Sequence, residues 1–312
     1  MSSHSGVPEA LVATPTRRAA HRVLGPALPY LLHLRPREWP IVTVHAAIGW
    51  LLAGGFRPVS GPAVLGLGAW VVALNGGTLA LNSAFDRDQG DVAYLRLPPA
   101  VPGGLAMFAG ALMLAGGVLT WSLPFPYRAA YLVCVALSVL YSVPPIRLKA
   151  VGGADWVINM VGFGLATPFA GWALSGRHFG GPRSLVIWAF LPLFGALYPL
   201  TQLYQMDEDR ARGDRTLVLR LGTRRSLALA LVATGLSFGL LFGAAWRSGW
   251  RGGHDWPRWS ALGAAMVAWL VVLGPWYRDG RRWSSAEHER GMYHALAAWI
   301  LTDVAVVLGW VT

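Results

Sequence analysis

The feature of the sequence that most limits its fold is a series of long apolar runs separated by short polar segments. Nine runs are predicted to be helices, over residues 39–56, 63–85, 105–123, 127–143, 156–174, 185–204, 227–246, 259–276 and 294–311. A run of about 18 apolar residues or more is long enough to cross a bilayer as a helix. A helix satisfies its own backbone hydrogen bonds in lipid, whereas a transmembrane barrel would show shorter segments of alternating polarity. The sequence therefore predicts an all-α polytopic membrane protein, a bundle of nine transmembrane helices.

The composition excludes the main soluble classes. Only 13% of the 312 residues are charged, about half the usual share in a soluble domain. The single cysteine, Cys134, lies inside an apolar run, so an internal disulfide is impossible. The net charge of +11 is assigned to orientation against anionic membrane lipid rather than to nucleic acid, for which we expect no binding.

The distribution of basic residues predicts the topology. Of the 26 Lys and Arg residues, 19 lie in the N-terminal segment and in the loops after the even-numbered runs, and 7 lie in the other loops. The positive-inside rule then places the N-terminus in the cytoplasm and, with nine spans, the C-terminus outside. Residues 1–34 are rich in Ser, Pro, Ala and Arg. They predict a disordered basic tail before a membrane domain over residues 35–312, although a transit peptide of similar composition stays open.

The acidic residues are concentrated at the predicted cytoplasmic side. Seven of the 15 lie in two segments that follow even-numbered runs: Asp86, Asp88 and Asp91, and then Asp207, Glu208, Asp209 and Asp214. The loop after the fourth run faces the same side and holds Arg147 and Lys149. Carboxylates gathered at a basic surface indicate a bound divalent cation, and Mg²⁺ is usually held by one or two carboxylates together with substrate phosphate oxygens.

Helical spacing indicates which of these side chains lie together. Asn82 and Asp86 are four residues apart and share a helix face, whereas Asp91 joins them only if the helix ends near Gly90. A second polar stripe is predicted to continue out of the sixth run: Tyr198, Gln202, Gln205 and Asp209. A solvated charged loop is the alternative for each segment, but polar groups at the depth of a span are costly and tend to be functional.

Three segments carry a resemblance to a known family. NSAFDRDQGD (82–91), YSVPPIRLK (141–149) and DEDRARGDRTLVLRLG (207–222) resemble the three signature regions of the UbiA superfamily of intramembrane prenyltransferases, and RPREWP (35–40) is also similar. The resemblance implies a helical bundle around a central cavity that opens to the bilayer. It also implies Mg²⁺-dependent transfer of an isoprenyl group from a prenyl diphosphate to a lipid-soluble acceptor, such as a quinone precursor or another lipid, with release of diphosphate.

The family pattern implies a role for each matching position. Asp86, Asp209, Arg147 and Lys149 would be the catalytic groups; the metal ligands would be Asn82, Asp86, Asp91 and Asp209. The groups that would bind the diphosphate are Asn82, Arg147, Lys149, Tyr141, Gln205, Gln202 and Arg215. Gly90 takes the place of the third residue of the first motif, and Gln202 and Gln205 take the places of two aspartates in the second. The pattern therefore leaves open whether one or two metal ions bind.

Other readings of the sequence stay open. A membrane terpene cyclase of the same fold would use the prenyl diphosphate alone, and a non-catalytic binder or transporter of isoprenoid lipids would not consume it. Asp155 and Asn159 either line the cavity or cap a helix, and Asp303 is expected to have a structural role inside the last run. The expected location is the cell (inner) membrane, with the active site facing the cytoplasm.

Overall fold

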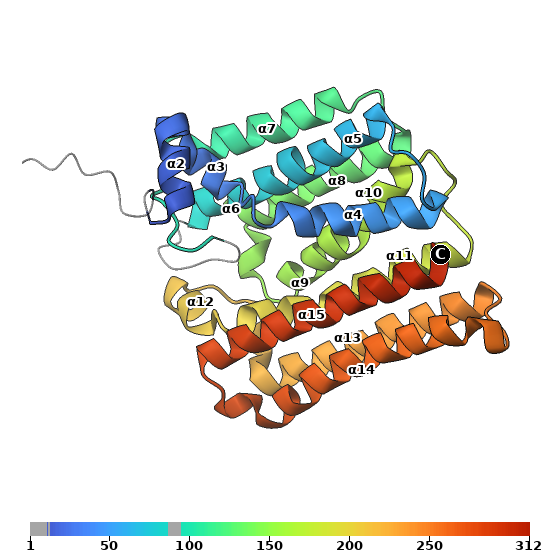
Figure 1. Ribbon diagram of the computed structural model, residues 1–312. Coiled ribbons are helices and arrows are strands. Elements are labelled where there is room, and N and C mark those ends of the chain that lie inside the picture. Colours follow the sequence, from blue (N-terminus) through green and yellow to red (C-terminus); the bar gives the residue numbers. More distant parts are fainter. Residues whose placement is uncertain (1–10, 12, 87–94) are drawn as a thin grey trace, which may run out of the picture.

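The computed structural model describes residues 11, 13–86 and 95–312, and the regular structure of these residues is helical. Two short helices, α2 (Pro15–Leu24) and α3 (Leu28–His33), precede the bundle. The bundle consists of α4 (Trp39–Gly54), α5 (Gly61–Gly68), α6 (Gly77–Asp86), α7 (Leu105–Leu119), α8 (Phe125–Ser142), α9 (Ala154–Asn159), α10 (Thr167–Leu174), α11 (Pro182–Leu203), α12 (Met206–Arg212), α13 (Leu217–Arg247), α14 (Trp256–Asp279) and α15 (Ser285–Trp310) (Figure 1). π-Helical segments join α5 to α6 over Ala69–Gly76 and α9 to α10 over Met160–Ala166. Short 3₁₀ turns lie at Gly25–Ala27, Leu148–Ala150, Gly253–Asp255 and Gly280–Arg282.

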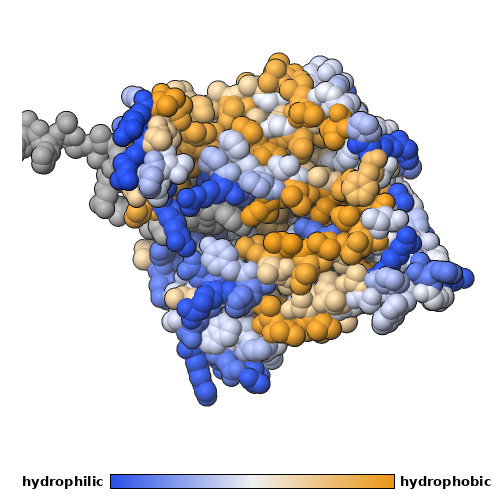
Figure 2. Space-filling view, viewed as in Figure 1, coloured by the Kyte–Doolittle hydropathy of each residue, from blue (hydrophilic) through white to orange (hydrophobic). Residues whose placement is uncertain are grey.

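The helices indicate a multi-pass membrane protein. Each of the nine predicted runs is helical, and in the described part of the chain seven helices are long and apolar enough to span a membrane. The other two, α4 and α7, are apolar but shorter. Figure 2 shows the corresponding surface: an apolar belt lies between two hydrophilic ends. The expected nine crossings and the orientation of the N-terminus stay predictions.

The N-terminal segment differs from the expected disordered tail between residues 15 and 33, where α2 and α3 form. The Thr14 hydroxyl accepts a hydrogen bond from the amide of Arg17, and Pro15 occupies the first turn, where its missing N–H costs nothing. The Arg17 guanidinium donates to the carbonyls of Arg96 and Leu97 at 2.6 and 2.9 Å. A local cap and these distant contacts order a segment whose composition alone indicates disorder.

Two hydrophobic cores meet at α4 and α10. The first packs the N-terminal helices around Trp70, Tyr127 and Tyr131. The second packs α11, α13, α14 and α15 around Trp269 and Trp276. Figure 1 shows these groups as the two halves of the bundle, with α4 and α10 beside both. The seam between the halves is where a cavity can form without opening either core.

Glycines allow α4 and α10 to approach closely. A Cβ atom on Gly49 would lie 1.7 Å from the carbonyl oxygen of Pro168, and one on Gly171 would lie 1.7 Å from that of Ala46. Each helix thus presents a glycine to the other's backbone, the kind of small-residue contact on which helix packing in membranes depends.

Candidate active site

A network of ion pairs connects three segments at one end of the bundle. Asp86 is the last residue of α6, and its carboxylate contacts both cations of the loop after α8: Arg147 at 3.3 Å and Lys149. The second guanidinium nitrogen of Arg147 lies 2.7 Å from the carboxylate of Asp214, which follows α12. Lys149 also donates to the amide oxygen of Asn82 at 3.3 Å. The four sequence-predicted residues Asn82, Asp86, Arg147 and Lys149 therefore lie together.

The network is largely removed from water. The side chains of Asp86 and Asp214 are 3% and 4% exposed, that of Lys149 is 9% exposed, and that of Arg147 is 26% exposed. Burial alone would lower the pKa of Arg147, but the charges and hydrogen bonds of Asp214 and Asp86 outweigh it and raise this pKa. Arg147 also adopts a left-handed backbone conformation (φ 37°), which is rare for a residue with a side chain and is found at functional sites.

A cavity of about 300 Å³ extends from this network between the two cores. Asn82 lines it and also contacts Lys149, so the ion pairs lie at its end. Its lining is mainly apolar and aromatic: Ile41, Trp70, Leu74, Leu79, Leu137, Tyr141, Ile158, Phe163, Phe194, Leu197, Tyr198, Met292, Leu296 and Trp299 are among its residues. Both π-helical segments contribute to it, through Leu74 and Asn75 and through Gly162 and Phe163. Segments of this kind are frequent at functional sites.

The segment before α4 lies at the same cavity. Arg35 and Glu38 line it, and the Arg35 guanidinium lies 3.5 Å from the hydroxyl of Ser83 on α6. Burial raises the pKa of Glu38 to about 7, against the opposing effect of the Arg35 charge. This acid belongs to the RPREWP segment, and no spacing or motif position in the sequence singles it out.

The second acidic segment is built differently from the predicted stripe. α11 ends at Leu203 and α12 begins at Met206, so the helix does not continue from Gln202 to Asp209. Gln205 occupies the break, and its amide donates to the Tyr204 hydroxyl at 3.2 Å. Asp209 is 4% exposed within α12, and its backbone carbonyl accepts from the amide of Asp214 at 3.0 Å. This turn places Asp214 where it meets Arg147.

Gln202 belongs to a buried hydrogen-bond cluster around Asp155. Its amide group donates to the Asp155 carboxylate at 2.8 Å and to the Tyr198 hydroxyl at 3.2 Å, and Tyr198 in turn is 3.0 Å from the hydroxyl of Tyr141. The same Asp155 oxygen accepts from the amide of Leu217 at 3.1 Å. Asp155 thus connects α9 to α11 and α13. This is a tertiary contact, which differs from both the expected helix cap and the expected place in the cavity wall.

The remaining predicted residues have different surroundings. Asn159 lines the cavity and donates to the backbone carbonyl of Asp155 at 2.8 Å. Arg215 is exposed, and its backbone amide donates to the carbonyl of Ala150 at 3.2 Å. Asp91 lies outside the described residues. Asp303 is 9% exposed within α15.

The ligand set suits a cation that is completed by a substrate. Within residues 11, 13–86 and 95–312, no three His, Cys, Asp or Glu side chains form a group that could hold a metal by themselves. The Lys149 ammonium, however, contacts both the Asn82 amide oxygen and the Asp86 carboxylate, so these hard oxygens already surround a cationic position. One or two protein oxygens with several substrate oxygens is the usual coordination of Mg²⁺ at phosphate sites.

Comparisons with known proteins show what the chain is similar to. Residues 41–297 match the model described as the UbiA prenyltransferase family, whereas no curated relative matches the chain by sequence. A UbiA homologue from Archaeoglobus fulgidus bound to DMAPP and Mg²⁺ is 18% identical, with 89% of this chain and 99% of that chain covered and a TM-score of 0.63. The same homologue bound to GPP and Mg²⁺ is 18% identical, with 90% of this chain and 99% of that chain covered and a TM-score of 0.64. A structure of digeranylgeranylglyceryl phosphate synthase is 15% identical, with 91% of this chain and 98% of that chain covered and a TM-score of 0.67. At these identities the solved structures show a common fold.

Proposed function

The chain belongs to the UbiA prenyltransferase family, and on this premise we propose that it transfers an isoprenyl group from a prenyl diphosphate to a lipid-soluble acceptor, with Mg²⁺ and with release of diphosphate. The observation that carries the proposal is the position of the ion pairs. Arg147, Lys149 and Asp86 meet at the end of a mainly apolar cavity that Asn82 also lines. A charged end and an apolar interior match the two parts of a prenyl diphosphate.

The diphosphate would bind at the charged end. Arg147 and Lys149 are held in place by Asp86 and Asp214 before a substrate arrives, so their donors need little reorganisation to meet phosphate oxygens. Arginine presents a planar fork of donors that suits phosphate, and lysine adds a compact charge. Both cations would stabilise the negative charge that grows on the leaving diphosphate as its bond to carbon breaks.

The acidic residues would hold the metal. Asn82 and Asp86 supply the oxygens around the Lys149 position, and Asp209 and Asp91 are the further ligands that the family pattern implies. When bound, Mg²⁺ would act as a Lewis acid on the diphosphate oxygens. The NH₂ group of Gln202 donates to Asp155 and Tyr198, so its amide oxygen, which has no hydrogen-bond partner among the described residues, is the atom left for a cation.

The cavity would hold the isoprenyl chain and exclude water. The aromatic rings of Trp70, Phe163, Phe194 and Trp299 line it, and ring faces stabilise positive charge that develops on an allylic carbon. The polar groups Asn75, Thr78 and Asn159 break the apolar wall and are the positions available for contact with an acceptor.

We also propose that the site faces the cytoplasm from the cell (inner) membrane. The support is the distribution of basic residues between the two ends of the bundle. New cysteines can be labelled selectively because the native Cys134 is buried. A cysteine at Arg210, on exposed α12, should react with an impermeant reagent only after cells are opened, and one at Arg251 should react in intact cells. The reverse pattern would contradict the orientation.

The test of the activity is diphosphate release by the protein in lipid nanodiscs. Prenyl diphosphates of several lengths would be supplied with Mg²⁺, with or without a membrane extract as the source of acceptor. Release that requires the extract supports the transferase, and mass spectrometry of the new lipid identifies the acceptor. Release without the extract would indicate cyclisation or hydrolysis. No release from folded protein would favour a binder or transporter of isoprenoid lipids.

A further inference from the structure

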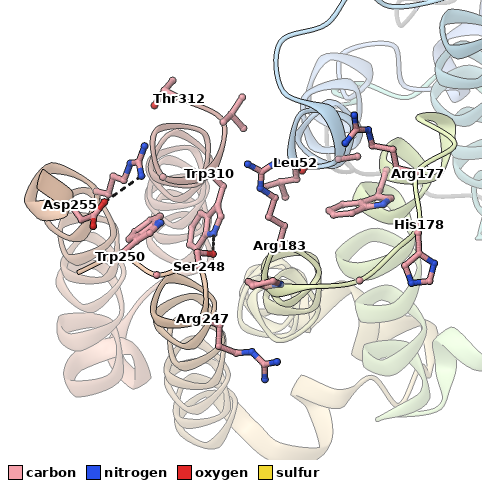
Figure 3. Close-up of a pocket in the computed structure, with 18 residues that line it drawn as sticks. Leu52, Arg177, His178, Arg183, Arg247, Ser248, Trp250, Asp255, Trp310 and Thr312 are labelled. Carbon is pink, nitrogen blue, oxygen red and sulfur yellow. Dashed lines mark hydrogen bonds and ion pairs between the residues drawn. The ribbon is translucent and has the colours of Figure 1, made fainter. Parts of the chain in front are cut away.

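A second, larger cavity lies at the end of the bundle opposite to Asp86 (Figures 1 and 3). It is open, has a volume of about 820 Å³, and is bounded by the end of α4, the α10–α11 and α13–α14 connections and the end of α15. Four arginines line it: Arg177, Arg183, Arg247 and Arg258. In Figure 3, Arg183 lies between Leu52 of α4 and Trp310 of α15. The proposed prenyl transfer uses none of these groups.

The charge of this arginine cavity is only partly balanced. Arg258 pairs with Asp255 at 3.4 Å, and Arg183 donates to the carbonyl of Leu52 at 3.2 Å. Among the described residues, the side chains of Arg177 and Arg247 have no ion-pair partner. The described lining thus holds four arginines and one acidic residue, Asp255, and a cationic excess remains.

The convergence is notable because this end of the bundle is poor in basic residues. The loops assigned to it hold 7 of the 26, and four of these seven line one cavity. Like charges brought together repel one another unless an anion binds between them. Arginine is also the side chain whose fork of donors suits a phosphate group.

Tryptophans lie close behind the arginines. Trp172, Trp250 and Trp310 are each 4–5% exposed, and the Trp310 indole donates to the Ser248 hydroxyl at 2.9 Å. Tryptophan is typical of the depth at which lipid headgroups meet the acyl chains. The cavity lies at the end of the spanning helices, next to the apolar belt (Figure 2), so its cations suit a lipid headgroup better than a small soluble anion.

We propose that the arginine cavity binds the headgroup of an anionic phospholipid. Arg177 and Arg183 contact the phosphate, and the acyl chains lie along the apolar belt of the adjoining helices. Such a lipid connects the loop between α10 and α11, which holds Arg177, to the start of α11, which holds Arg183.

The test measures lipid binding to the purified full chain by native mass spectrometry. Dioleoylphosphatidylglycerol and dioleoylphosphatidylcholine differ in charge but have the same acyl chains. The wild type should keep one phosphatidylglycerol under conditions that remove phosphatidylcholine. The double variant Arg177→Gln/Arg183→Gln should bind phosphatidylglycerol about tenfold more weakly or worse. The matched control Arg57→Gln/Arg251→Gln removes the same charge from the same end outside the cavity, and should bind as the wild type does.

Three results would overturn the proposal. The first is equal retention of the two lipids by the wild type, a comparison that needs no variant to fold. The second is an equal loss in the cavity variant and in its control, which would show a diffuse effect of charge. The third is complete displacement of phosphatidylglycerol by excess inorganic phosphate, which would indicate a site for a free anion.

Discussion

Replacing Asp86 by asparagine keeps the size of the side chain and removes the charge that contacts both Arg147 and Lys149. The free-energy cost of losing this charge differs between the two ion pairs. Arg147 is 26% exposed and keeps Asp214 at 2.7 Å, so this pair contributes at most about 1 kcal/mol. Lys149 is 9% exposed and is left with the Asn82 amide oxygen at 3.3 Å. Removing one partner of a buried pair costs about 3–5 kcal/mol, and the remaining hydrogen bond favours the lower end.

We therefore expect Asp86→Asn to lower the free energy of unfolding by about 3 kcal/mol. We expect it to lower diphosphate release at least about a hundredfold, because it removes a metal ligand and disturbs two positioned donors. Asp207→Asn is the matched control, since its carboxylate is 83% exposed and pairs with Arg210 at the surface. It should change neither quantity measurably.

A second substitution separates the loss of stability from the loss of catalysis. In Asp86→Asn/Lys149→Gln the buried ammonium is also gone, so thermal unfolding in detergent should recover most of the lost stability. Diphosphate release should stay at the low level. Retention of more than about a tenth of the wild-type rate by Asp86→Asn would refute the assignment. So would recovery of activity in the double variant, because Asp86 would then serve only to neutralise Lys149.

Other substitutions test the fold and the surroundings of the site. Gly171→Ala should abolish accumulation of folded protein because its Cβ would meet a backbone carbonyl of α4, whereas Gly243→Ala, with no atom within 4 Å of the added Cβ, should fold normally in a size-exclusion assay. Gln202→Glu should destabilise the protein in thermal unfolding, since it would place a second carboxylate against the buried Asp155; stability equal to that of the wild type would contradict the cluster. Burial raises the pKa of Glu38 from 4.5 to about 7, so the folded state binds this proton more tightly and wild-type stability should fall as pH rises from about 4.5 to 7. Glu38→Gln should remove that part of the pH dependence, and above pH 7 its free energy of unfolding should exceed that of the wild type by up to about 3 kcal/mol. An unchanged dependence of stability on pH would show that Glu38 is not held protonated.

Much of the site could be located from sequence because its residues lie at predictable ends of helices. Asn82 and Asp86 share a face through the four-residue helical spacing, and the loop with Arg147 and Lys149 follows a helix whose end is visible as a change from apolar to polar residues. The charge distribution placed both segments on one side of the bundle. Their meeting at Asp86 agrees with that placement.

Other contacts depend on which helix packs against which. Asp214 appeared in the sequence as one acid among several, and only the turn at the end of α12 brings it to Arg147. The predicted stripe from Tyr198 to Asp209 assumed one helix, but the chain breaks at Gln205. Asp155 had two local explanations, and its contacts to α11 and α13 are with residues 47 and 62 positions away. Periodicity carries no information about partners at such distances.

The sequence by itself determined that this chain is helical, apolar enough for a membrane and charged at the ends of its helices. Backbone hydrogen bonding in lipid and the helical repeat impose those properties locally. The tertiary structure alone decided the cavity between the two cores, the partners of Arg147 and Gln202, and the gathering of four distant arginines at the far end. These features arise where separate helices meet, and the close approach of α4 and α10 at their glycines fixes that meeting.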